Sequence, residues 1–70
     1  MDRTPVSSSN VASVGYDPDT ETLEVGFVKG TVYQYSSVPP EVFEEFMQAA
    51  SKGIYLNNVI KVRFSVMRIG

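Results

Sequence analysis

Alternating apolar and polar residues run through the first half of the chain and predict three β-strands. These segments are residues 11–16, 22–28 and 31–36. Asp17-Pro18-Asp19-Thr20 forms a strong turn between the first two, because aspartate side chains bond the backbone ahead and proline presets φ. Lys29-Gly30 forms the second turn. We therefore expect a three-stranded antiparallel meander. Its first strand should direct three residues to one face: Ala12, Val14 and Tyr16.

The register of the second hairpin decides which residues share a face. A two-residue turn at Lys29-Gly30 would separate Phe27 from the tyrosines of the next strand. A three-residue loop with a left-handed Gly30 would instead form a bulge. We favour the bulged form because it sets Val25 opposite Tyr33 and Leu23 opposite Tyr35. This arrangement groups five residues on the inner side: Leu23, Val25, Phe27, Tyr33 and Tyr35.

A helix should begin directly after the third strand. Val38 precedes a proline and is therefore biased away from helical angles, whereas Pro39 and Pro40 suit a first helical turn. The helix should continue to about Ala50. Its apolar stripe packs on the sheet and consists of Val42, Phe43, Phe46, Met47 and Ala50.

A second, short helical segment follows, capped by Ser51. We expect Gly53 to keep it short. Its apolar positions are Tyr55, Leu56, Val59 and Ile60. Residues 61–70 alternate again, with Val62, Phe64 and Val66 on one side, and this pattern fits either a fourth strand or an extended arm. The predicted fold class is therefore α+β, with one main helix on a meander.

Length and composition narrow the function. Seventy residues form one domain, for which we expect a tail at residues 1–10 and a folded unit at residues 11–70. Cysteine and histidine are both absent, which removes disulfides, most metal centres and the usual general base. We therefore expect no catalytic residue, no metal and no cofactor. No apolar run is long enough to span a bilayer, so cytoplasm is the expected location and a membrane partner is not expected.

Charge is distributed unevenly along the chain. All eight acidic residues lie within residues 1–50, whereas residues 51–70 hold no acid. That last segment contains Lys52, Lys61, Arg63 and Arg68. Such asymmetry is typical of a surface that faces anions, although a solvated basic edge explains it as well.

The sequence resembles the KTSC domain family, a short module named after the C-terminal extension of some lysyl-tRNA synthetases. The matching motifs cover about residues 6–69 and include Ser8-Ser9-Asn10-Val11, Val14-Gly15-Tyr16-Asp17 and Ser51-Lys52-Gly53 with Tyr55. Tyr33-Gln34-Tyr35 followed by Val38-Pro39-Pro40-Glu41-Val42-Phe43 is the most specific part. The resemblance implies an α+β mini-domain without known enzymatic activity, of the kind found as single-domain bacterial or phage proteins, and an association with RNA.

Two uses remain open for the signature tyrosines. Tyr33 and Tyr35 can stack bases, or they can pack under the helix with their hydroxyls at the rim. We favour packing, and we interpret Tyr33, Tyr35, Pro39 and Pro40 as structural.

The function that we rank first is a small non-catalytic binding module for RNA or single-stranded nucleic acid. The residues expected to contact it lie in the basic last third: Lys52, Tyr55, Asn58, Lys61, Arg63 and Arg68. The alternative is a protein-interaction module or homodimer that uses a sheet edge or the Val62-Phe64-Val66 stripe.

Overall fold

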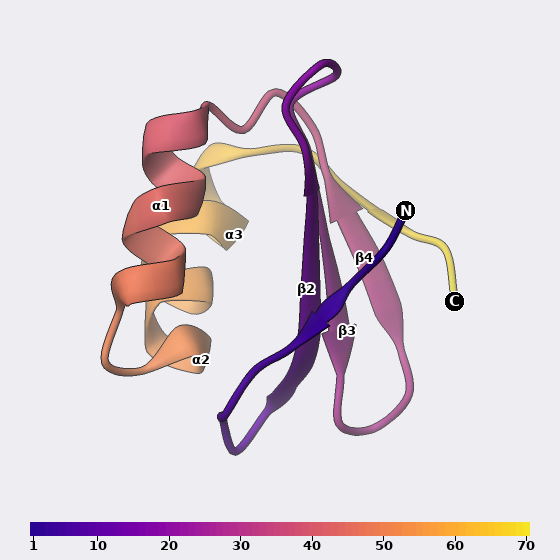
Figure 1. Cartoon of the computed structure of the whole chain (residues 1–70), viewed down its shortest axis with the longest axis vertical. Helices are drawn as coiled ribbons and strands as arrows, with labels where there is room; N and C mark the ends of the chain where they lie inside the picture. Colours follow the sequence, from indigo (N-terminus) through magenta and orange to yellow (C-terminus); the bar gives the residue numbers. More distant parts are fainter.

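The computed structural model describes residues 1–70 as a five-stranded antiparallel sheet with helices on one face (Figure 1). The strands follow chain order across the sheet and are β1 (Thr4–Pro5), β2 (Val11–Asp17), β3 (Thr22–Phe27), β4 (Val32–Tyr35) and β5 (Val66–Arg68). The α+β class is confirmed, and the predicted meander forms the three central strands. Two short strands extend it: β1 pairs with β2, and β5 pairs with β4.

The helical side consists of two rods. α1 spans Pro40–Gln48, close to the predicted range. A second continuous rod comprises α2 (Lys52–Tyr55), the π-helical turn η1 (Leu56–Ile60) and α3 (Lys61–Arg63). Ser51 caps it as predicted, since its hydroxyl accepts a hydrogen bond from the Ile54 amide. The prediction of a short segment was wrong, because Gly53 does not end the helix and the rod continues to Arg63.

The hairpin between β3 and β4 has the predicted bulged register. Val25 lies opposite Tyr33, and Leu23 lies opposite Tyr35. The Phe27 amide donates to the Thr31 carbonyl, and Gly30 takes a φ of 104° within this loop. Because only glycine adopts such an angle at little cost, Gly30 fixes which side chains share a face.

The first predicted strand contains an irregularity that its alternation did not reveal. The pairing of β2 with β3 shifts between Val11 and Ser13, which is a β-bulge. Val11 is consequently fully buried, whereas Ala12 is exposed. The prediction that Ala12 faces inward was therefore wrong, while Val14 is buried as expected.

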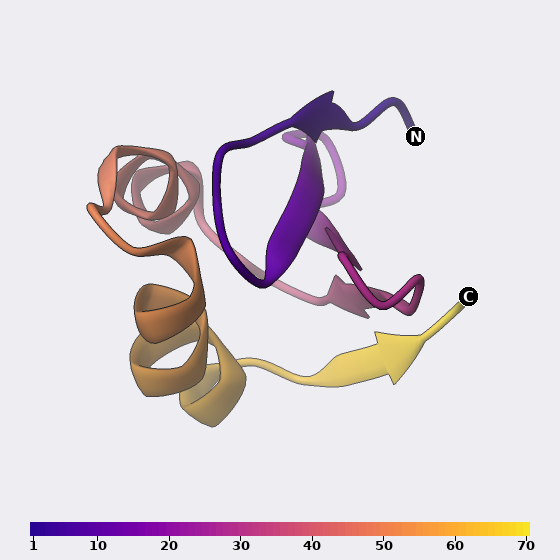
Figure 2. The same ribbon diagram turned by 90° about the horizontal axis from the view of Figure 1, so that it is seen from below.

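A single apolar core lies between the sheet and the two helical rods (Figure 2). The sheet and the segment after it contribute Val11, Val14, Leu23, Val25, Tyr35 and Val38. The helices contribute Val42, Phe46, Leu56 and Ile60. Ala50 lies beyond the end of α1 and is exposed, so it does not belong to the predicted stripe.

The opposite face of the sheet is covered by the N-terminal residues. Glu24 is buried there, and its two carboxylate oxygens accept hydrogen bonds from Arg3 and Gln34 at 2.8 and 2.9 Å. The chain passes so close to Gly15 that an added Cβ would lie 2.6 Å from the Asp2 carbonyl oxygen. Residues 1–10 therefore lead into β2 and also form β1 over this face.

The C-terminal alternation does not form one stripe. Val62 belongs to α3 and is 71% exposed, whereas Phe64 follows the helix and packs against the core. Val66 begins β5, so the three residues lie on three different kinds of structure. These three residues therefore do not form one face of a strand, and of the two alternatives for residues 61–70 the fourth strand of the meander exists as β5.

Candidate functional site

Two cavities meet at one end of the helical face of the sheet, and both are lined by Phe27 and Tyr33. The turn cavity has a volume of about 680 Å³ and is further lined by Ser9, Asn10, Val28, Lys29 and Thr31. The helix cavity has a volume of about 410 Å³ and is further lined by Tyr35, Leu56, Asn57, Lys61 and Val66. Together they form one surface, which we call the aromatic groove. Its volumes lie within the range of small-ligand sites.

The shared wall of the aromatic groove is a pair of aromatic rings. Phe27 and Tyr33 have ring centroids 5.7 Å apart and planes inclined by 80°. Both side chains are only partly buried, so ring surface is available to a ligand. The register created by Gly30 places the two rings on the same face of the sheet, as the bulged hairpin predicted.

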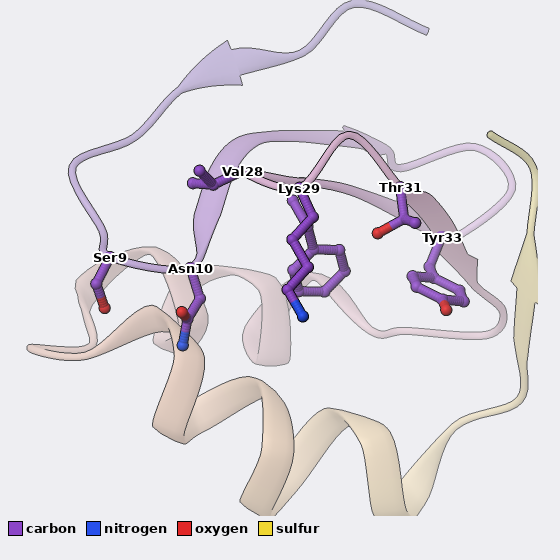
Figure 3. Close-up of a pocket in the computed structure, with 7 residues that line it drawn as sticks. Ser9, Asn10, Val28, Lys29, Thr31 and Tyr33 are labelled. Carbon is purple, nitrogen blue, oxygen red and sulfur yellow. The ribbon is translucent and has the colours of Figure 1, made fainter.

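The turn cavity is held in shape by contacts between two loops. The Val28 amide donates to the Asn10 carbonyl at 2.9 Å, which ties the hairpin loop to the start of β2. Figure 3 shows Asn10, Lys29 and Tyr33 pointing toward the helical side, whereas Val28 points away from it.

Positive charge surrounds the aromatic groove. Lys29 lines the turn cavity and Lys61 lines the helix cavity. Arg68 pairs with Tyr33 across β4 and β5, and directly opposite residues project from the same face of a sheet. The Arg63 guanidinium is engaged elsewhere, 5.5 Å from the centroid of the Phe64 ring in a cation–π contact, and it lines neither cavity.

The remaining charges lie elsewhere. Arg3 is paired with Glu24 on the opposite face. None of the eight acidic residues lines either cavity. Asp17 ends β2 and Asp19 and Glu21 lie in the turn that follows, at the other end of the sheet from Lys29, and three more acids lie on α1. The aromatic groove is therefore a basic region on a protein whose net charge is −2.

The structure separates the six residues predicted to bind nucleic acid. Lys61 lines the groove and Arg68 lies opposite Tyr33, which lines it, whereas Arg63 lines neither cavity and lies over the Phe64 ring. Lys52 instead donates to the carbonyls of Met47 and Ala49 at 2.9 and 3.0 Å, which satisfies the end of α1.

Tyr55 and Asn58 also lie away from the aromatic groove. The Tyr55 hydroxyl donates to Glu45 at 2.7 Å, and its ring packs against Phe46. Burial and this bond to a carboxylate raise the Tyr55 pKa. Asn58 is exposed and lines neither cavity, whereas its neighbour Asn57 lines the helix cavity.

Three of the four signature residues have structural roles, and the fourth lines the aromatic groove. Tyr35 is buried in the core, and desolvation raises its pKa. Pro39 is the N-terminal cap of α1 and Pro40 its first residue; the Pro39 carbonyl accepts from the Val42 amide. Tyr33, by contrast, lies on the wall of both cavities.

Sequence reasoning missed Phe27 and Lys29 as site residues, and of the neighbouring Asn57 and Asn58 it selected Asn58. Lys29 and Phe27 were assigned only to a turn and to the inner face. The sequence did contain a signal for these two residues. Lys29 lies in the hairpin turn that follows Phe27, and such a turn lies at the end of the sheet. No cluster of carboxylates converges in a way that would hold a metal ion. None of the helices combines the length and apolarity needed to cross a membrane.

A five-stranded antiparallel sheet with two helical rods on one face, without an assembled catalytic group, defines a small α+β domain. Residues 7–64 match the sequence profile of the KTSC domain, and the chain belongs to this family. The fold agrees with the crystal structure of a KTSC domain protein from Yersinia pestis, with a TM-score of 0.91 and 47% identity. That comparison covers 99% of this chain and 97% of the other.

Relatives include both stand-alone proteins and parts of larger enzymes. A protein of Tsukamurella paurometabola is 40% identical over 93% of this chain and 97% of its own length. An uncharacterized protein of Stutzerimonas stutzeri is 44% identical over 87% of this chain and 86% of its own. A lysine–tRNA ligase of Nostoc punctiforme is 41% identical over 80% of this chain, which corresponds to 10% of that ligase. The family is one of uncharacterised function rather than a known catalytic one.

Proposed function

We propose that this domain is a non-catalytic module that binds single-stranded RNA in the aromatic groove. The observation that carries the proposal is the partly exposed Phe27–Tyr33 pair between Lys29 and Lys61, in a region without acidic residues. Aromatic surfaces on a sheet stack unpaired bases, and cations along the same groove hold the backbone. One relative is named a lysine–tRNA ligase, and this name supports RNA as the nucleic acid that is bound.

The chemistry of the aromatic groove favours single strands over duplexes. Stacking on Phe27 or Tyr33 requires unpaired bases, because in a duplex the faces of the bases are covered by neighbouring bases. Three cations, Lys29, Lys61 and Arg68, give a weak electrostatic contribution. If all three neutralise phosphates, the logarithm of the binding constant falls with the logarithm of salt at a slope of about −2.

The direct test is an NMR titration of the labelled domain with a single-stranded RNA octamer at low and moderate salt. We expect shifts at residues lining the aromatic groove, and we expect them to weaken with salt. The duplex of the same sequence is the matched control and should produce smaller shifts. Shifts confined to α1, or identical shifts with duplex and single strand, would contradict the proposal.

A second candidate is self-association through β5. Its edge exposes Val66, Met67 and Ile69, which are 49, 65 and 47% accessible. Exposed apolar strand edges pair with other strands unless they are protected. Sedimentation over a range of protein concentrations tests this candidate, since a dimer through β5 should disappear in a Met67→Lys variant. A monomer at every concentration would remove it.

A further inference from the structure

The two rings in the aromatic groove form a wedge rather than a slot. Parallel rings are able to sandwich one base between them. Phe27 and Tyr33 are instead inclined by 80°, with the edge of one ring toward the other, so no flat space exists between them. A base must therefore stack on the outer side of the pair, in the turn cavity or in the helix cavity.

Each side of the wedge also carries its own cation. Lys29 belongs to the turn cavity and Lys61 to the helix cavity. A strand that follows both lysines must pass over the ring pair. Successive bases are then separated, with one on each side of it.

The two cavities differ in what they offer to a base edge. Asn10 packs against the helix, since its amide nitrogen would lie 3.2 Å from a Cβ added at Gly53. The turn cavity otherwise presents the hydroxyls of Ser9 and Thr31, which donate or accept with any base. Asn57 is exposed in the helix cavity, and its side chain makes no hydrogen bond within the protein.

We propose that the aromatic groove splays two successive bases around Phe27 and Tyr33, and that Asn57 hydrogen-bonds the base in the helix cavity. This inference rests on the proposed single-strand binding and specifies its ligand as an unstacked dinucleotide. The Asn57 amide offers N–H donors beside a carbonyl acceptor. In a single strand the Watson–Crick edge of each base is free and includes a neighbouring donor and acceptor, so Asn57 adds affinity at this position without selecting one base.

The number of bases is tested with the unaltered protein and a series of RNA hexamers. All positions are abasic except one, two or three adjacent uracils. We expect the second base to raise affinity about tenfold over one base, by its own stacking contact, and the third to add little. Equal gains from the third base would indicate a flat platform and overturn the inference, as would a full gain from a single base.

Failure of the inference and failure of the proposed function are separable in the same series. If bases raise affinity over the fully abasic hexamer, the proposed stacking function is supported, and a gain that is complete after one base or that continues equally to the third overturns the inference alone. If bases add no affinity over the fully abasic hexamer, the proposed function falls as well. If no hexamer binds even at low salt, the proposed function falls, and the inference with it.

The Asn57 contact is tested with Asn57→Ala, and Asn58→Ala is the matched control on the same helical turn. Hexamers that carry one base or two adjacent bases are compared with the fully abasic hexamer. In the unaltered protein and in Asn58→Ala the second base should raise affinity about tenfold, whereas in Asn57→Ala the gain should be smaller, because the base in the helix cavity keeps its stacking contact but loses its hydrogen bond. An equal gain in Asn57→Ala and in the unaltered protein would refute the role of Asn57.

Discussion

The ring of Tyr16 lies flat against the ring of Phe43, with centroids 4.5 Å apart and planes inclined by only 7°. The Tyr16 hydroxyl also donates to the carbonyl of Val38, the fully buried residue that precedes Pro39 and Pro40. One side chain on β2 thus fixes both the approach to α1 and its first turn. This contact gives the proline pair of the family signature a structural purpose.

Replacing Tyr16 with phenylalanine should test that link. The variant keeps the stacked ring but leaves the Val38 carbonyl without its partner. We expect the free energy of unfolding in urea to fall by about 1 kcal/mol. Tyr33→Phe is the control, because the Tyr33 hydroxyl makes no hydrogen bond within the protein, and it should change stability little. Equal losses in the two variants would show that the Val38 contact does not matter.

Two lysines of the second helical rod should have different roles, one in stability and the other in RNA binding. Lys52→Met removes the donor that satisfies two carbonyls at the end of α1, so it should lower the free energy of unfolding by about 1 kcal/mol and leave RNA affinity unchanged. Lys61→Met should weaken RNA binding and reduce the salt slope by roughly 1 without loss of stability. Urea unfolding and RNA titrations check both. Loss of RNA binding in Lys52→Met alone would contradict the assignment.

Glu24 should be the most sensitive charged residue. Glu24→Ala leaves Arg3 and Gln34 without their shared acceptor, and we expect a loss of about 2 kcal/mol in unfolding free energy. Arg3→Ala should cost less, about 1 kcal/mol, because the Arg3 side chain is 32% exposed and water reaches the carboxylate once it is removed. Urea unfolding of both variants checks the order. A larger loss in Arg3→Ala than in Glu24→Ala would argue against this account.

The turn glycine controls the register that creates the aromatic groove. Gly30→Ala places a side chain at a φ of 104°, so we expect a loss of about 1–2 kcal/mol in unfolding free energy. Gly30→Asn should lose less, since asparagine tolerates positive φ better. Cross-strand nuclear Overhauser contacts between Val25 and Tyr33 report the register. If Gly30→Ala keeps both its stability and these contacts, the glycine is not required.

Alkaline pH should destabilise the protein. Burial raises the pKa of Tyr16, Tyr35 and Tyr55 in the folded state. Above pH about 10 the unfolded chain releases these protons while the folded chain retains them, so the free energy of unfolding must fall as pH rises through that range. Below it, this contribution is fully present. Urea midpoints measured between neutral pH and pH about 11 check the direction.

A single variant tests one part of the alkaline response. Tyr55→Phe removes both the titrating hydroxyl and its bond to Glu45. Its loss of stability between neutral and alkaline pH should therefore be smaller than that of the unaltered protein. A stability that stays constant or increases with pH in the unaltered protein would contradict the raised pKa values.

The central meander and the start of α1 were predictable because their signals are local. Gly30 and the grouping of apolar residues determined the bulged hairpin, and the proline pair marked the helix. β1 and β5 were harder, since Thr4 pairs with Val14 and Arg68 pairs with Tyr33, thirty-five residues away. Neither pairing leaves a local pattern. Alternation at Val62, Phe64 and Val66 suggested a strand, but the helix extends to Arg63, because the buried Ile60 anchors it in the core.

The candidate site was only partly predictable for a related reason. The basic last third drew attention to Lys61, which lines the helix cavity, but residues of equal charge need not lie at the same place on the surface. Lys52 reaches back to the end of α1, and Lys29 reaches the groove from a turn far earlier in the sequence. Which lysine faces a groove depends on packing between distant segments, and composition does not contain this information.

The separation of charge described above also affects how partners arrive. Acidic residues occupy α1 and the turn between β2 and β3, whereas none lines the aromatic groove, so positive and negative charge are separated on the protein surface. A polyanion approaching from solution is repelled by one side and attracted to the other before any contact forms. The orientation of each encounter is thus selected at a distance, and productive collisions become more frequent as ionic strength falls.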